Sequence, residues 1–407
     1  METKKKGFPT AFWVCACTEI FERLAYYLGR SLILIFVTAS VATGGLGLSD
    51  TVAANMQSNL TAFSYLLPLF GAVIVDKYIG ARYTTPVGMF IAAAGYFTGG
   101  IAKSSAGVYA MIFLVSLGLA LFKNGAIIGR VITDKSQMDP AFSMRYTLVN
   151  VGAFIGTFLV GILYKDVFAK DGVLGFAPCF KMAALMMVLG GLWYIFVCWR
   201  FLGDLGKLPF KKTLTEEEKA AEAKKKEETG TKQPLTTIEK KRIGAIFVAS
   251  LFSIVFWIFW YLGYMPVYFY WAENMDWVVA GYQVPSTWFD AANSLFCVIL
   301  GPVTAALWKK LAARPQGDMS LFRKTGLGIA IIGVGYLFYA AIDIMRGGEK
   351  ASVLWLIVFA FLLTMGEMFF SPLGHSFISK YSPSRYLAVM MSVWGFATFI
   401  AAKSYGP

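Results

Sequence analysis

Hydrophobic and small residues occur in long runs along this chain, and short polar segments separate one run from the next. An α-helix rises about 1.5 Å per residue and the hydrocarbon core of a bilayer is about 30 Å thick, so about 20 apolar residues form one membrane-spanning helix. The pattern predicts eleven such spans. In chain order they cover residues 9–37, 52–75, 85–102, 106–132, 142–165, 176–202, 243–271, 285–312, 322–345, 352–380 and 386–405.

The longest polar segment, residues 203–242, separates six predicted spans from five. Its centre, residues 215–232, mixes Glu, Lys and Ala, which is typical of a solvated helix or a flexible linker. The pattern therefore predicts an N-terminal six-helix bundle at residues 1–202, a cytoplasmic linker at 203–242 and a C-terminal bundle at 243–407. Because five spans follow the linker, we expect that a twelfth span is missing from the chain.

The amino-acid composition indicates a membrane protein, and the distribution of its charges does not require a nucleic-acid partner. Of the 407 residues, 57% are hydrophobic and 15% are charged, against about 25% charged residues in a soluble domain. Continuous apolar runs of this length are not typical of a β-barrel, whose strands alternate. The net charge is +13, but Lys and Arg gather in alternate short loops, as at Lys77 and Lys380. The positive-inside rule explains this distribution without a nucleic-acid partner and predicts a cytoplasmic N-terminus.

The first predicted span is unusual because charged residues lie in its middle. Glu19, Glu22, Arg23 and Arg30 share one helical stripe with Tyr26. A charge that faces lipid at mid-helix costs at least about 2.5–3.5 kcal/mol, so this stripe faces protein or a water-filled cavity. Two interpretations stay open: a buried salt-bridge network that fixes helix packing, or a transport or proton-relay site.

Several motifs carry a resemblance to a known family. Glu-x-x-Glu-Arg at residues 19–23, followed by Tyr26-Tyr27 and Arg30, resembles the signature of the proton-dependent oligopeptide transporters, the POT or PTR family of the major facilitator superfamily. Further matches follow in the expected order and together cover nearly the whole chain outside the linker. They are Tyr65 before Leu66 to Gly71, Lys123-Asn124, Tyr146 with Asn150 and Gly152, Phe256-Trp257, Asn293, Gly366-Glu367, Ser371-Pro372 and Trp394.

The resemblance implies a fold class and a transport cycle. The fold would be an all-α membrane protein of the major facilitator type, with two six-helix bundles related by a pseudo-two-fold axis. The substrate site of such carriers lies near the bilayer midplane, between the halves, and opens to each side in turn.

A peptide is a zwitterion, so its site needs cations for the carboxylate and an anion for the amino group. The N-terminal half offers cations and hydroxyl donors, whereas the C-terminal half offers Glu367. The resemblance implies the same division, with Arg23, Tyr27 and Lys123 toward the carboxylate and Glu367, Asn150 and Asn293 toward the amine. The expected substrate-binding residues are Arg23, Tyr26, Tyr27, Arg30, Tyr65, Lys123, Asn150, Trp257, Asn293, Glu367, Ser371 and Trp394.

Proton coupling needs a carboxylate whose proton affinity changes with its surroundings. A nearby Arg stabilises the charged form of a carboxylate and burial disfavours it, so making or breaking a contact of Arg23 with Glu19 or Glu22 would switch proton binding. We therefore predict Glu19, Glu22 and Arg23 as the proton-coupling residues. We expect Lys123 to sense the substrate carboxylate, and protons to be the coupling ion with no other cofactor.

Two positions depart from the family pattern. The family usually has Lys-Pro-Asn in the fourth span, but here the sequence is Lys123-Asn124-Gly125. The family usually has an acid in the seventh span where this chain has Tyr261, which puts the usual extracellular gate pairing in doubt.

We predict a proton-coupled symporter that imports di- and tripeptides by alternating access. The alternative keeps the fold and changes the cargo to another small organic or inorganic anion, such as a peptide-like drug or nitrate. An enzyme is not expected, because the chain has one His and no visible metal-ligand pairs or nucleophile–base pairs. We expect a functional monomer that crosses a bacterial inner membrane several times, with the lipid bilayer, peptides and protons as partners.

Overall fold

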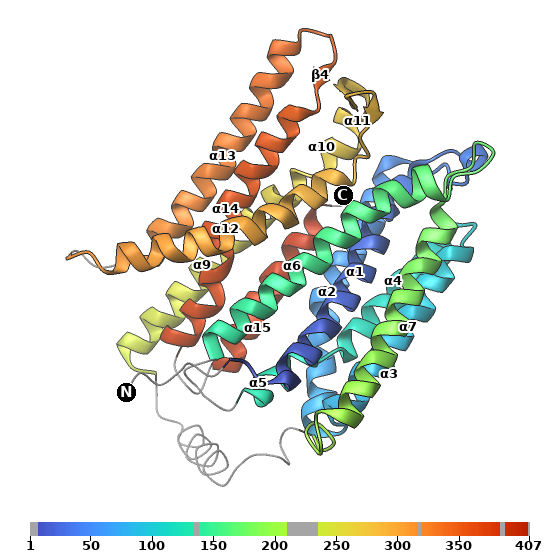
Figure 1. Ribbon diagram of the computed structural model, residues 1–407. Coiled ribbons are helices and arrows are strands. Elements are labelled where there is room, and N and C mark those ends of the chain that lie inside the picture. The colour runs from blue at the N-terminus through green and yellow to red at the C-terminus, as the bar shows by residue number, and fades with distance from the viewer. Residues whose placement is uncertain (1–6, 133–137, 210–234, 316–318, 383–386, 406–407) are drawn as a thin grey trace. The chain divides into compact units, whose positions relative to one another are not determined.

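The computed structural model describes residues 7–132, 138–209, 235–315, 319–382 and 387–405 (Figure 1). Each predicted span corresponds to a helix, and two of them are broken into pieces. The long helices are α1 (Thr10–Thr38), α2 (Asp50–Lys77), α3 (Ala81–Ile101), α4 (Ser105–Leu121), α6 (Met138–Ile162), α7 (Phe176–Arg200), α9 (Thr237–Leu262), α12 (Trp288–Ala312), α13 (Leu321–Arg346), α14 (Leu354–Tyr381) and α15 (Leu387–Ser404).

Short elements complete the described chain. A 3₁₀ turn, η1, follows α1, a π-helical turn, η3, extends α6, and two two-stranded sheets lie in the loops of the C-terminal half: β1 pairs with β4 in parallel, and β2 with β3 antiparallel. Their bounds are η1 (Val41–Thr43), α5 (Asn124–Val131), η3 (Leu163–Val167), α10 (Met265–Tyr268), α11 (Tyr270–Asn274), β1 (Met275–Asp276), β2 (Val278–Val279), β3 (Tyr282–Gln283) and β4 (Ala351–Ser352).

Apolarity and length identify the helices that can cross a membrane. Among the described residues, six helical stretches are long and apolar enough: they lie in α2, α6 with η3, α7, α9 with α10, α12 and α13. Three shorter apolar stretches lie in α4, α14 and α15. Helix α1 has 29 residues, but its middle carries the four charges noted above. Its charged stripe is therefore the feature that packing has to accommodate.

The chain divides into two compact units, and each is described by itself. The N-terminal unit contains Met1–Ser49 and Leu67–Thr213, and the C-terminal unit contains Asp50–Leu66 and Leu214–Pro407. The first part of α2 thus packs with the helices of the C-terminal unit, where the Ser58 hydroxyl donates to the carbonyl oxygen of Ala402 at 2.8 Å. The linker and domain boundaries predicted from the sequence stay a prediction, since most of the linker lies outside the described residues.

Glycines bring the helices of the N-terminal unit close together. A Cβ atom added at Gly156 of α6 would lie 2.5 Å from the backbone oxygen of Leu24, and one at Gly152 would lie 2.8 Å from that of Ile20. Figure 1 shows α3 beside α4 and α7 in the same unit, and Gly88 of α3 meets α4 at a similar backbone approach. Small residues allow such approaches in membrane helices, where dispersion contacts replace the hydrophobic effect as the driving force. The charged part of α1 is therefore held at a fixed distance from α6.

The fourth predicted span is interrupted where the family-like Lys123 occurs. Helix α4 ends at Leu121 and α5 begins at Asn124, and Lys123 adopts a non-helical backbone with φ −127° and ψ 32°. Its backbone N–H donates to the Thr85 hydroxyl of α3 at 3.3 Å, which satisfies a group that a continuous helix would have paired internally. The break lets Asn124 begin a new helix and point its side chain at α1.

In the C-terminal unit, α13 packs on α14 but leaves a groove toward α9. On one face of α13, Gly328 approaches the carbonyl oxygen of Gly366 in α14. On another face, Cβ atoms added at Gly326 or Gly333 would meet nothing within 4 Å. The apolar groove has a volume of about 210 Å³ and is lined by Val255, Phe256, Phe259, Ile329, Ile332, Gly333 and Tyr336.

A glycine pair tests the close approach of α1 and α6. Gly156→Ala should destabilise the protein by about 1–3 kcal/mol, because the new methyl group overlaps the backbone of α1. Gly326→Ala is the matched control, since the same change there enters open space and removes a helix-weakening residue. Thermal unfolding in detergent, followed by size-exclusion chromatography, measures both. Equal melting temperatures for the two variants would contradict the described packing.

Candidate functional site

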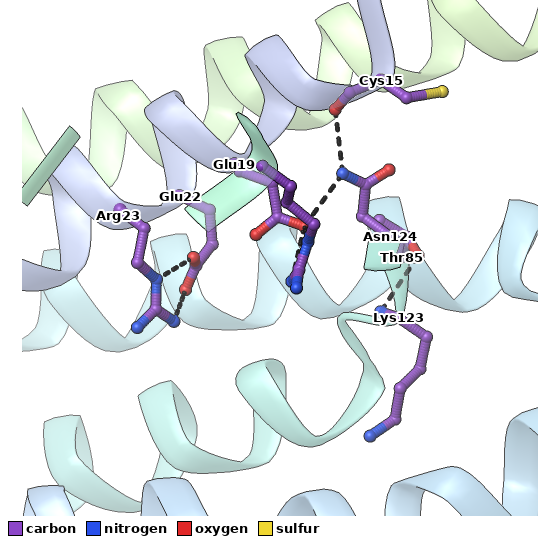
Figure 2. Close-up of polar contacts among 8 residues, drawn as sticks. Cys15, Glu19, Glu22, Arg23, Thr85, Lys123 and Asn124 are labelled. Carbon is purple, nitrogen blue, oxygen red and sulfur yellow. Dashed lines mark hydrogen bonds and ion pairs between the residues drawn. The ribbon is translucent and has the colours of Figure 1, made fainter. Parts of the chain in front are cut away.

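An ion pair between neighbouring residues lies in the middle of α1 (Figure 2). The Arg23 guanidinium donates through Nε to Glu22 Oε2 at 2.5 Å and through Nη2 to Glu22 Oε1 at 2.6 Å. The Glu22 side chain is fully buried, whereas the Arg23 side chain is 26% exposed. Bidentate geometry of this kind is among the strongest charge-assisted hydrogen bonds. The pair buries the carboxylate and leaves part of the cation accessible.

Glu19 has a different partner from the one that the sequence suggested. Its Oε1 accepts from Nε of Arg145 at 3.0 Å and from the amide nitrogen of Asn124 at 3.2 Å. Figure 2 shows the Asn124 side chain turned toward α1, where it also donates to the carbonyl oxygen of Cys15 at 2.8 Å. Of the two contacts predicted for Arg23, this structure contains the one with Glu22. The Arg145 guanidinium of α6 compensates the charge of Glu19, and the Asn124 amide of α5 adds a hydrogen bond.

Aromatic rings continue the stripe beyond the charged pair. The Arg23 guanidinium carbon lies 4.9 Å from the centroid of the Tyr26 ring, and that of Arg30 lies 5.9 Å from the Tyr27 ring. The two tyrosine rings meet edge to face at 5.3 Å. Cation–π contacts stabilise partly desolvated guanidinium groups. Arg23, the two tyrosines and Arg30 thus form one continuous line of side-chain contacts along α1.

Two predicted residues of the N-terminal unit lie apart from the charged pair of α1. The Lys123 ammonium donates to the carbonyl oxygen of Pro68 in α2 at 2.9 Å, and in Figure 2 its side chain extends away from Glu19 and Glu22. The amide nitrogen of Asn150 donates to the carbonyl oxygen of Tyr146, one turn earlier in its own helix, at 3.0 Å.

The C-terminal unit holds a buried carboxylate among neutral groups. Glu367 of α14 is 9% exposed and accepts from the amide nitrogen of Asn293 in α12 at 3.1 Å. The Cys297 thiol lies 3.9 Å from the same oxygen, and Asn293 also donates to the Thr364 hydroxyl at 2.9 Å. Among the described residues of this unit, no Lys or Arg forms an ion pair with Glu367. A buried carboxylate in neutral surroundings is a strong site for a ligand cation.

Aromatic residues of α9, α14 and α15 form a cluster in the same unit. The rings of Phe256 and Phe370 stack with centroids 4.0 Å apart, and Phe370 in turn stacks on Trp394 at 6.1 Å. Trp257 meets Phe256 edge to face at 5.3 Å. Tyr261, which replaces the expected acid, is buried and stacks on Tyr405, directly after α15, at 4.8 Å. Its position is therefore packed as part of the aromatic cluster.

Two further predicted residues, Tyr65 and Ser371, belong to α2 and α14. Tyr65 lies in the part of α2 that belongs to the C-terminal unit, and its side chain is exposed. Ser371 follows Phe370 in α14, but its side chain lies outside the described residues.

Arg145 is the residue that sequence reasoning missed. It lies in the fifth predicted span directly before Tyr146, so it is an intramembrane cation by the same criterion that singled out Arg23. Asn124 was noted as part of the Lys123-Asn124 motif and for the missing proline, but not as a partner of Glu19. A search for every charge inside an apolar run would have found Arg145, but its pairing with Glu19 depends on how α1 and α6 cross.

Comparisons with known proteins agree with this architecture. The sequence model of the POT family matches residues 204–406. The chain belongs to the POT family. Matches to individual relatives of the family extend over nearly all of the chain. An uncharacterised transporter, YclF, of Bacillus subtilis (strain 168) is 25% identical and the match covers 98% of this chain and 87% of that protein. A di-/tripeptide transporter of Lactococcus lactis subsp. cremoris is 24% identical, with 95% of this chain and 86% of that protein covered.

Solved structures of POT proteins confirm the predicted fold. A crystal structure of peptide transporter POT in complex with sulfate superposes with a TM-score of 0.85 at 24% identity, covering 99% of this chain and 89% of that chain. A mutant of that transporter in complex with alafosfalin gives a TM-score of 0.83 at 25% identity with the same coverage. The protein is thus a multi-pass membrane transporter of the major facilitator fold.

The hydrogen bond from Asn293 to Glu367 can be tested without a substrate. Asn293→Ala removes the amide that donates to Glu367, so the free energy of unfolding should fall by about 1–3 kcal/mol. Asn274→Ala is the control, because Asn274 donates only to the carbonyl oxygen of Tyr270 at an exposed position. Thermal unfolding in detergent compares the two variants. If Asn293→Ala melts no lower than the control, the hydrogen bond does not support Glu367.

Proposed function

We propose that this protein imports di- and tripeptides together with protons by alternating access. The observation that carries the proposal is the neutral environment of buried Glu367, which suits the amino group of a peptide. Relatives that are named di-/tripeptide transporters support the same cargo. A simple anion such as nitrate is disfavoured as the cargo, because Glu367 would repel it.

The N-terminal unit would bind the carboxylate end of the peptide. The Arg23 guanidinium is partly exposed even while it pairs with Glu22, so it is available to a second carboxylate. Tyr26, Tyr27 and Arg30 follow along the same stripe, and Lys123 supplies a further cation from the break between α4 and α5. A guanidinium matches a carboxylate in a planar, bidentate arrangement, which makes Arg23 the proposed anchor.

The C-terminal unit would bind the amino end. An ammonium group beside Glu367 would convert a buried lone carboxylate into a compensated ion pair. Asn293, whose amide also donates to Thr364, would hold the carboxylate in place. Trp257 and Trp394, on the aromatic cluster, would contact peptide side chains, and Tyr65, Asn150 and Ser371 complete the proposed set. Rings of this kind accept side chains of varied shape because their contact is largely non-directional.

Proton coupling would use the ion pair of α1. A proton that binds Glu22 neutralises it and releases the Arg23 guanidinium, which then binds the substrate carboxylate. Loss of the proton restores the pair and expels the carboxylate. One residue thus exchanges partners between an internal acid and the substrate, and the two ligands become thermodynamically linked. Protons are the only cofactor that this cycle needs.

We further propose that the N-terminus is cytoplasmic and that the protein acts as a monomer in the plasma membrane of a bacterium. The alternating basic loops support the orientation. The exposed apolar surfaces of the long helices support burial in lipid. A transporter without chemical catalysis accounts for these features, so we do not propose an enzyme.

Glu22→Gln should uncouple transport from the proton gradient. A permanently neutral residue 22 keeps Arg23 released, so proton-driven accumulation of a labelled dipeptide should fall at least about tenfold while counterflow exchange persists. Proteoliposomes with and without an inward proton gradient measure both activities. Uphill uptake at the wild-type level in this variant would contradict the role of Glu22. Wild-type uptake of nitrate but not of dipeptide would favour the alternative cargo.

Glu367→Gln should weaken recognition of the peptide amine. Loss of a buried charge partner should weaken dipeptide binding by about 30-fold or more, because the ammonium is left uncompensated. An N-acetylated dipeptide, which has no ammonium, should lose little affinity. Glu273→Gln, at an exposed position of α11, is the control for removing a negative charge from this unit. Competition against labelled dipeptide uptake measures all three, and equal losses for both peptides would reject the assignment.

A further inference from the structure

Arg145 has no role in the cycle described so far, although its cation is committed to a buried acid. We propose that Arg145 is a positioning residue that keeps Glu19 in a permanent ion pair, so that Glu22 alone exchanges a proton during transport. This inference rests on the proposed symport and refines it, because the sequence predicted both Glu19 and Glu22 as proton sites.

The two ion pairs differ in how they can open. Glu22 and Arg23 are neighbours on one helix, so a change of side-chain rotamers separates them. Glu19 belongs to α1 and Arg145 to α6, and the distance between these helices is fixed by the backbone contacts of Gly152 and Gly156. Positions 145, 152 and 156 share one stripe of α6, so the same face carries both the cation and the close contacts. Opening this pair would require the two helices to move apart.

The hydrogen bonds of Glu19 also favour a permanent pair. Oε1 accepts from Arg145 Nε and lies 3.0 Å from Nη2, while Asn124 donates from a third direction at 3.2 Å. The Glu19 side chain is 2% exposed, and that of Arg145 is 30% exposed. The direct partner of Glu22 is Arg23 on the same helix, whereas the partners of Glu19 come from two other helices, α5 and α6.

The departure from the family pattern at Asn124-Gly125 fits this role. A proline at position 124 would have no amide to donate to Glu19. The Arg145 guanidinium passes over Gly125, where an added Cβ would lie 3.0 Å from its central carbon. Asn124 therefore supplies a donor, and Gly125 leaves room for the cation. Both substitutions are local to the helix break and act on the same ion pair.

Other ionisable groups near Glu19 come from each helix packed on α1. Helix α6 contributes Arg145, which also attracts Glu22 electrostatically, and α1 itself contributes Glu22 and the Cys15 thiol. Helix α7 contributes Tyr194 and Cys198 beside Cys15, and the Asn124 amide of α5, a neutral group, donates to Glu19. Arg145 is therefore the one cation among the described residues that contacts Glu19 directly.

The test compares Glu22→Gln, Arg145→Gln and the double variant Glu19→Gln/Arg145→Gln in proteoliposomes. Arg145→Gln should lower dipeptide uptake at least about tenfold, because it leaves a buried acid without its cation, and the double variant should recover at least about threefold over it. The ratio of proton-driven uptake to counterflow should collapse in Glu22→Gln and persist in the double variant. A collapse of equal size in the double variant would overturn the proposal.

A second measurement does not depend on transport. Dicyclohexylcarbodiimide modifies protonated carboxyl groups in apolar surroundings, and peptide mass spectrometry locates the modified residue. Glu22 should be modified in the wild type, whereas Glu19 should be modified only after Arg145→Gln; Arg145→Lys should protect it again. Modification of Glu19 in the folded wild type at the rate of Glu22 would refute the proposal. Failure of wild-type dipeptide uptake would instead reject the proposed function, and the labelling would still decide the state of Glu19.

Discussion

The structure depends on one constraint: a charged side chain within a membrane helix needs a partner in the protein, because water is not there to solvate it. Helix α1 carries four charges, and each acid is paired in a different way. Glu22 uses the neighbouring Arg23, whereas Glu19 needs Arg145 from α6. The pairing of Glu19 with Arg145, together with the Asn124 hydrogen bond, requires α1, α5 and α6 to pack against one another. The charged stripe of α1 therefore constrains how the helices of the N-terminal unit pack.

The C-terminal unit solves the same constraint differently. Glu367 is surrounded by neutral donors within its unit, and its compensation can therefore come from a ligand. A unit with internally balanced ion pairs and a unit with a lone buried acid are chemically complementary to the two ends of a zwitterion. The proposed function uses this difference: it assigns protons and the peptide carboxylate to one unit and the peptide amine to the other.

The sequence was sufficient for the positions of the helices and for naming candidate residues of the site, but not for the pairing of side chains. Apolar runs predicted the position of every long helix, because length and hydrophobicity dominate membrane insertion. The break at Phe122 and Lys123 was not predicted, since no proline or polar run marks it and the Thr85 hydroxyl of α3 compensates the backbone. The charge of Arg145 was visible in the sequence, yet its contact with Glu19 follows from the crossing of two helices. Contacts between distant segments depend on packing geometry that a one-dimensional pattern does not encode.

Phe256 lies between the aromatic cluster and the apolar groove of the C-terminal unit. One side of its ring stacks on Phe370 in the aromatic cluster, while the side chain also lines the apolar groove between α9 and α13. The groove is apolar and its rim residues Val255 and Phe259 are exposed, so in a membrane it is open to acyl chains. The phenyl ring of Phe256 therefore separates this groove from the aromatic residues that we propose to contact peptide side chains. A smaller side chain at this position would enlarge the groove and loosen the aromatic cluster at the same time.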